Sequence, residues 1–219
     1  MENQNDSVVY SGAVIEFVAV AREVCSFMEQ VDGFEKPVFI DKTRKILPLL
    51  YYKSVMLPAT EAVYEDGPEK FVSEQEWQVI HDSILGKLGR HNDYPEVMDP
   101  VMRDTDDSVG GSIAENLADI YQDLKDFVMV YRMGTVELMN DALWECMQHF
   151  DQDWGQKLLN CLRALHNLLH GQEDLSDDDN EDSPENGTTE NTNDWIFSKR
   201  QRLWNEGEDN LSGPDNTET

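Results

Sequence analysis

Apolar residues that recur every three or four positions run through most of this 219-residue chain, and this spacing constrains its fold more than any other feature. It is the period of an amphipathic α-helix, because a half-buried strand would instead alternate at every second residue. In the clearest case, segment 113–132, the apolar residues on one face are Ile113, Leu117, Ile120, Tyr121, Leu124, Phe127, Val128 and Tyr131. No segment has a convincing strand pattern. The sequence therefore predicts an all-α fold.

Breaking and capping residues divide this pattern into about six helices. The predicted ranges are 11–31, 37–57, 73–88, 113–132, 136–149 and 152–170. Ser73 with Glu76 has the spacing of a capping box, and so has Ser112 with Glu115. Pro48 lacks the N–H that a helix interior needs, so we expect a kink or a break there.

The connections between these helices favour one compact bundle. Most are short, which favours antiparallel neighbours, and we predict a single helical bundle domain over residues 8–171. Residues 91–111 are the long exception, and we expect a loop there with one short turn at 97–102.

Composition changes abruptly at Gln172. Residues 172–198 contain ten acids and no Lys or Arg, with few apolar residues. Such a segment cannot offset the entropy lost on ordering, so residues 172–219 are predicted to be a disordered acidic tail.

The charge of the chain excludes some partners. Asp and Glu number 45 against 17 Lys and Arg, a net charge of −28. Nucleic acids and anionic membranes are bound through clustered Lys and Arg, so neither is an expected partner. Basic proteins and metal cations are compatible with this charge.

Several features favour a cytoplasmic protein. The first six residues lack the positive region of a signal peptide, and the apolar run 46–52 is far too short to span a membrane. Cys25, Cys146 and Cys161 are odd in number and lie among apolar residues, as expected of reduced, buried thiols.

A stripe of acids on the fourth predicted helix is the first candidate site. Glu115, Asp119, Asp123 and Asp126 recur at spacings that place them on one side. Gathered carboxylates are typical Mg²⁺ ligands, and all-helical nucleotide pyrophosphohydrolases bind Mg²⁺ in this way. A second acidic helix from Glu137, Asp141 and Glu145 is equally consistent with a solvent-exposed face. A solvated face is the favoured interpretation of the stripe, and no cofactor is expected apart from this Mg²⁺ alternative.

His166 and His170 are the second candidate. One helical turn separates them, which is a spacing that can chelate a metal. A hydrogen-bonded histidine at the edge of the core is the favoured alternative for His166, and a favourable contact with the helix dipole for His170.

A short segment of the tail, residues 195–204, is the third candidate. It places Trp195, Ile196, Phe197, Leu203 and Trp204 close to basic residues within an otherwise polar tail. An amphipathic segment on a flexible tether is a plausible helix-in-groove ligand. Its target is either another protein or the chain's own bundle.

Three segments have the character of family signatures. They are Ile46-Leu47-Pro48-Leu49-Leu50-Tyr51 with Lys53 and Leu57-Pro58, then Leu117 to Phe127, and Trp154 to Leu158 with Arg163 to His166. Together they resemble the bacterial domain-of-unknown-function 5063 family over about residues 8–170. The family has no established activity, so the resemblance implies only a bacterial, cytosolic, single-domain helical protein. It also points to residues that could line one site: Tyr51, Asp119, Asp123, Asp126, Trp154, Gln156 and His166.

These observations favour a non-enzymatic protein-interaction or adaptor protein, because the sequence contains no recognisable catalytic arrangement. The alternatives are a metal-dependent all-helical hydrolase, similar to the nucleotide pyrophosphohydrolases, that uses the carboxylates of the fourth helix, and a small-ligand sensor.

Overall fold

The structure, a computed structural model, describes residues 8–95, 110–171 and Leu175. Its helices are α2 (Gly12–Met28), α3 (Lys36–Val55), α4 (Glu74–Leu88), α5 (Ile113–Met133), α6 (Val136–His149) and α7 (Gly155–His170), with short helical turns at η1 (Val31–Gly33), η2 (Gly89–His91) and η4 (Phe150–Trp154). The predicted all-α fold with about six helices is confirmed. The expected turn at 97–102 and the motif at 195–204 lie outside the described residues.

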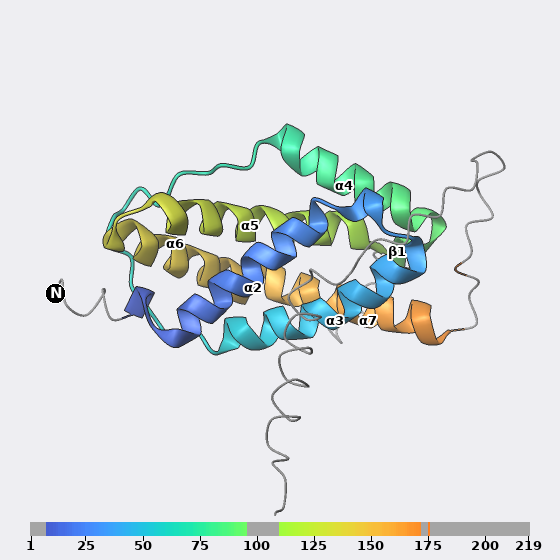
Figure 1. Cartoon of the computed structure of the whole chain (residues 1–219), viewed down its shortest axis with the longest axis horizontal. Helices are drawn as coiled ribbons and strands as arrows, with labels where there is room; N and C mark the ends of the chain where they lie inside the picture. The colour runs from blue at the N-terminus through green and yellow to red at the C-terminus, as the bar shows by residue number, and fades with distance from the viewer. Residues whose placement is uncertain (1–7, 96–109, 172–174, 176–219) are drawn as a thin grey trace, which may run out of the picture. The chain divides into compact units, whose positions relative to one another are not determined.

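Helix α5 is the centre of the fold (Figure 1). It packs against α2, α4, α6 and α7. Residues on more than one side of it are completely buried, among them Ile113, Ala114, Leu117, Ala118, Ile120 and Leu124. A helix that is apolar on several sides is stable only inside a ring of neighbours, which explains its place in the bundle. None of the helices in the described part of the chain is long and apolar enough to cross a membrane.

Helices α6 and α7 follow one another as a nearly continuous helical run beside α5. The π-helical turn η4 joins them without an intervening loop. Three contacts show the register with α5: Asp123 with His149, Asp119 with Lys157, and the carbonyl of Ile113 with Cys161. From the first contact to the last, the position falls by 10 residues on α5 and rises by 12 on the α6–α7 run. The run therefore passes antiparallel along α5 without reversing direction. The two predicted helices, 136–149 and 152–170, are therefore both present, but a π-helical turn joins them and they are not antiparallel neighbours.

Gly155 explains how the π-helical turn is accommodated. A Cβ atom on Gly155 would lie 2.4 Å from the carbonyl oxygen of Phe150. Real Cβ atoms do not approach that closely, so a larger residue would displace the backbone of this turn.

Two short strands contradict the prediction that the chain has none. β1 (Asp93–Pro95) pairs antiparallel with β2 (Gly110–Ser112), and Tyr94 lies opposite Gly111. A Cβ on Gly111 would lie 2.5 Å from the Tyr94 ring, and the Tyr94 hydroxyl accepts a 2.5 Å hydrogen bond from Asn116 Nδ2. Three residues are too few to show an alternating pattern, so the pairing had no detectable sequence signal.

Of the kink or break expected at Pro48, the break does not occur, because α3 continues through this residue from Lys36 to Val55. Pro48 itself is exposed, whereas Ile46, Leu47 and Leu50 around it are buried. Packing of these apolar residues stabilises the helix despite the missing backbone hydrogen bond, because tertiary burial provides most of the stability of a protein helix.

The structure confirms two residues that the sequence predicted as helix caps, Ser73 and Ser112. Ser73 and Glu76 form the predicted capping box, and Ser112 Oγ accepts from the Glu115 N–H. The first helix ends at Met28, three residues before the predicted end, because η1 follows it.

Candidate functional site

The chain between α3 and α4 crosses the bundle without forming a helix or strand. We call residues 57–73 the strap. Asp126 Oδ1 accepts hydrogen bonds from the N–H groups of Phe71 (2.7 Å) and Val72 (2.9 Å). The two oxygens of Asp141 accept from Val63 N–H (2.7 Å) and Tyr64 N–H (2.8 Å). Each aspartate thus holds two successive backbone amides of the strap.

These two aspartates are among the most buried polar groups of the bundle. Asp126 is 4% exposed and Asp141 is 1% exposed. Asn140 beside them is also buried and donates to the carbonyl of Glu61 at 2.7 Å. Burying a carboxylate costs stability unless hydrogen bonds compensate it, and the strap supplies those bonds. Asp141 is therefore not on a solvent-exposed face, so the interpretation of Glu137, Asp141 and Glu145 as such a face is wrong for Asp141.

Asp119, another predicted site residue, joins three helices. Its Oδ1 accepts from Trp77 Nε1 of α4 at 2.8 Å, and its Oδ2 accepts from Lys157 Nζ of α7 at 2.7 Å. Lys157 also donates to Asp153 at 2.7 Å. Burial disfavours the charge on Lys157, but its two carboxylate partners outweigh this and raise its pKa. Both oxygens of Asp119 are thereby used within the protein.

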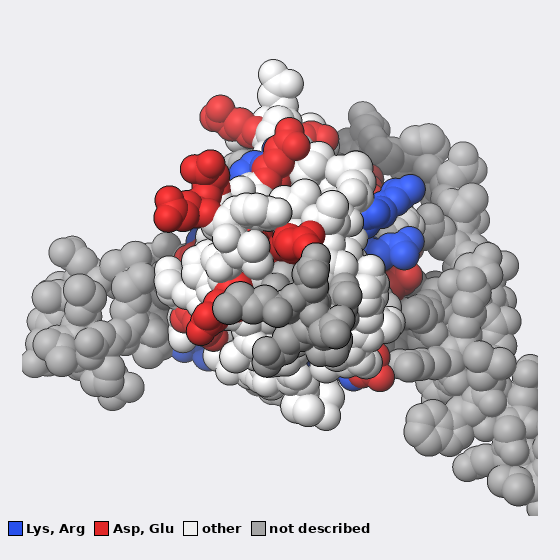
Figure 2. Space-filling model, turned by 90° about the vertical axis from the view of Figure 1, so that its left-hand side faces the viewer, with Lys and Arg blue, Asp and Glu red and all other residues white. Residues whose placement is uncertain are grey.

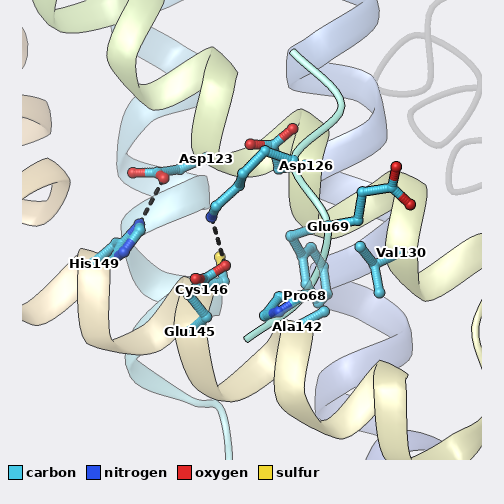
Figure 3. Close-up of a pocket in the computed structure, with 11 residues that line it drawn as sticks. Pro68, Glu69, Asp123, Asp126, Val130, Ala142, Glu145, Cys146 and His149 are labelled. Carbon is cyan, nitrogen blue, oxygen red and sulfur yellow. Dashed lines mark hydrogen bonds and ion pairs between the residues drawn. The ribbon is translucent and has the colours of Figure 1, made fainter. Parts of the chain in front are cut away.

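Asp123 lies in a pocket between the strap, α5 and α6. The hollow measures about 240 Å³ when space open to solvent is counted, and Pro68, Glu69 and Lys70 of the strap form one wall. Figure 3 shows Asp123 and His149 pointing toward one another across it. Their Oδ1 and Nδ1 atoms are 2.7 Å apart. Burial raises the pKa of Asp123, and the interaction with His149 only partly opposes this.

Cys146 completes a group of cysteine, histidine and aspartate residues around the pocket. Its thiol is 4% exposed, and burial raises its pKa well above the usual value. Because the thiolate is the reactive form, this environment suppresses nucleophilic chemistry at Cys146. His149 and Asp123 form a hydrogen-bonded pair, but the described residues that line this pocket present no activated nucleophile beside it.

The predicted metal ligands do not come together. In residues 8–95 and 110–171, no three His, Cys, Asp or Glu side chains are grouped so that they could hold a metal ion. His166 is exposed, and its ring centroid lies 4.5 Å from that of His170. It is five residues beyond Cys161, which already contacts the first residue of α5, so it lies past the end of the helix that carries the aspartates.

The remaining predicted pocket residues contribute to packing. The Tyr51 ring lies 5.3 Å from that of Phe150, which lies 4.7 Å from that of Trp154. Trp154 is completely buried and donates from Nε1 to the carbonyl of Cys146 at 3.3 Å. Gln156 is exposed and donates to Asn160 at 3.1 Å. The structure thus brings Tyr51 and Trp154 into one aromatic cluster, separate from Gln156.

An exposed apolar surface surrounds the turn between α5 and α6. We call it the apolar end face, and its residues are Tyr10 (56% exposed), Val63 (44%), Tyr64 (50%), Met133 (59%) and Leu138 (37%). The Tyr10 hydroxyl lies 4.0 Å from Met139 Sδ, and Asp141 holds the amides of Val63 and Tyr64. Figure 2, which views this end, shows uncharged residues across much of it and acids around them.

Sequence reasoning did not find this surface because its residues come from several segments. Single exposed apolar residues are ordinary in proteins, and only their gathering in space is informative. Asp126 was found through the acidic stripe, whereas the burial of Asp141 could have been suspected only from its place among apolar neighbours in 138–147.

Comparisons with known proteins agree with this fold. A crystal structure of protein BF1032 from Bacteroides fragilis is 40% identical, with a TM-score of 0.69, and the match covers 76% of this chain and 98% of that one. Among curated proteins no sequence matches. The profile of a domain of unknown function, DUF5063, matches residues 8–171, three quarters of the chain, and confirms the resemblance seen in the sequence. The chain therefore belongs to the DUF5063 family.

Proposed function

We propose that this chain is a non-enzymatic, cytoplasmic interaction or adaptor protein that binds its partners through the apolar end face. The gathering of five large apolar side chains, each at least 37% exposed, carries the proposal. Exposed apolar patches with polar margins typically mark interaction sites on soluble proteins. The tail segment 195–204 is a second binding element of the same proposal.

The use of the carboxylates supports a non-enzymatic role. Asp126 and Asp141 hold the strap, and Asp119 binds Trp77 and Lys157. A hydrolase that used these carboxylates would need their oxygens free to coordinate Mg²⁺.

Affinity capture with the full chain tests this function. In an end-face variant, Tyr64→Ser with Met133→Ser, we expect the loss of bound partners that mass spectrometry identifies with the wild type. The matched control is Val79→Ser, which removes a 64% exposed apolar residue from α4. Retention of every partner by the end-face variant would reject the proposal.

A small-ligand sensor or metal-dependent hydrolase is the second candidate, and the Asp123–His149 pair in its pocket favours it. Calorimetric melting with Mg²⁺ or Mn²⁺ separates the metal-dependent hydrolase from the proposed interaction protein. A metal at about 100 times its dissociation constant would stabilise the fold by about 2.7 kcal/mol. We expect only a slight shift, whereas a large one that is abolished by Asp123→Asn would favour the hydrolase.

A further inference from the structure

We propose that the apolar end face binds the tail segment 195–204 of a second copy of this chain, so that two copies exchange tails. This inference rests on the proposed function and names the partner. Its basis is the chemistry of the surface, the chemistry of the segment, and the place where the tail leaves the bundle.

The end face would favour an apolar segment with positive charge. Four acids lie within two residues of its members in the sequence: Glu61, Glu65 and Asp66 flank Val63 and Tyr64, and Glu137 precedes Leu138, while Arg132 precedes Met133. Glu137 is charged at neutral pH, since hydrogen bonds from the Thr135 side chain and its own backbone lower its pKa. An apolar surface with an acidic margin selects a ligand that combines apolar and basic side chains.

The segment 195–204 has this composition. Its large apolar residues are Trp195, Ile196, Phe197, Leu203 and Trp204, and its bases are Lys199, Arg200 and Arg202. Aromatic and arginine side chains contribute most of the affinity at many protein interfaces. The 23 residues 172–194 that precede the segment carry ten acids and no base, so the positive charge of the tail before Gly207 is concentrated at the segment itself.

Geometry favours a second copy over the chain's own bundle. The tail leaves α7 after His170, whereas the end face surrounds the turn before α6, and the 14, 5 and 16 residues of α6, η4 and α7 separate the two. At 1.5 Å per residue this run spans about 50 Å. The acidic composition of residues 172–194 predicts an unstructured linker, and 23 residues of such a chain have a root-mean-square reach of about 25 Å. Binding of the segment 195–204 to the end face of its own bundle would therefore require strong stretching.

Two copies arranged side by side in opposite directions remove this stretching. The end of α7 in each copy then lies next to the end face of the other, and both tails can bind at once. Such an exchange closes into a two-fold symmetric dimer, the commonest form of soluble oligomer.

Sedimentation velocity on full chains tests the exchange. The wild type should change from monomer to dimer as its concentration rises. The tail variant Leu203→Ser with Trp204→Ser and the end-face variant Tyr64→Ser with Met133→Ser should each weaken dimerisation by about tenfold or more, as expected from the apolar surface that they no longer bury. Val79→Ser should dimerise as the wild type does.

An equimolar mixture of the two variants provides the sharpest result. The tail variant retains an intact end face and the end-face variant an intact tail, so the mixture should form a dimer that neither variant forms alone. Circular dichroism of each variant checks that it remains folded.

Two outcomes would overturn the inference: a wild type that stays monomeric at every concentration, or variants that dimerise as strongly as the wild type. The proposed function fails separately, when the end-face variant still captures every partner. If the wild type is monomeric but the end-face variant loses a captured protein, only the tail exchange is rejected.

Discussion

Asp126 and Asp123 lie one turn apart on α5 but differ in their burial and in their hydrogen-bond partners. Asp126 is buried and bound to two backbone amides of the strap. Asp123 is partly open to the pocket and pairs with His149, which is itself partly exposed. Asp126 has two amide donors for its buried carboxylate, whereas the interaction with His149 only partly offsets the cost of burying Asp123.

This difference distinguishes a buried structural acid from an acid that lines a pocket, which their spacing in the sequence does not. Both residues belong to the same periodic stripe, and the sequence assigned them the same metal-binding hypothesis. The pKa of Asp123 is raised by burial, which means that the fold disfavours its charge. The carboxylate of Asp126 instead accepts two hydrogen bonds from backbone amides, which offset the cost of its burial.

Removing a strap aspartate should have the largest effect. Asp126→Ala or Asp141→Ala leaves two backbone N–H groups without an acceptor, and we expect a loss of about 3 kcal/mol in the free energy of unfolding. Urea denaturation measures it. Glu115→Ala, at an exposed position of α5, is the control and should cost no more than about 1 kcal/mol, because it removes only an acid of the first helical turn. A loss below that of the control would mean that the strap contributes little to stability.

Asparagine substitutions sharpen the comparison between the two strap sites. A single oxygen of Asp126 accepts both amides, so the side-chain carbonyl oxygen introduced by Asp126→Asn can replace it at a cost of about 1 kcal/mol. Asp141 uses both oxygens, and an amide NH₂ cannot accept from an N–H group. Asp141→Asn should therefore cost about 1 kcal/mol more than Asp126→Asn in the same denaturation experiment. Equal losses would show that one oxygen is sufficient at both sites.

Asp123→Asn should have a smaller effect of the opposite sign. It removes a buried charge but keeps an oxygen that can accept from His149, so we expect a gain of less than about 1 kcal/mol at pH 7. Thermal melting of both proteins measures this. A large loss of stability would show that Asp123 stabilises the fold in the way that the strap aspartates do.

The pH dependence of this effect has a defined direction. The pKa of Asp123 is raised in the folded chain, so the folded state binds more protons than the unfolded state between the ordinary aspartate pKa and the raised value. The contribution of Asp123 to stability therefore falls as the pH rises through that window. The advantage of Asp123→Asn should grow through the same window and then stay constant.

Removing the tail should have the smallest effect on the bundle. A chain that ends at Gly171 keeps α2 to α7 and both strap aspartates, so its unfolding free energy at low concentration should equal that of the full chain. Circular dichroism should remain strongly helical, with one cooperative melt. Loss of the cooperative transition would show that residues 172–219 are part of the folded core.

The sequence predicted the helices well because each has a long apolar face with recognisable ends. It could not predict contacts that depend on tertiary packing. Pro48 remains within α3 because its neighbours are buried, and the Tyr94–Gly111 pairing involves only three residues on each strand. The candidate site was predicted in part: Asp123 lies in a pocket, but its partner His149 belongs to another helix and was not singled out.

The way the strap is held has a consequence for its local dynamics. Residues 65–67 between the two attachments are exposed, whereas the amides of Val63, Tyr64, Phe71 and Val72 are bound to buried carboxylates. In native-state hydrogen exchange, these four amides should exchange slowly within a segment that otherwise exchanges quickly. Because separate helices carry the two aspartates, each pair should respond to its own aspartate substitution, so that the strap opens as two local units.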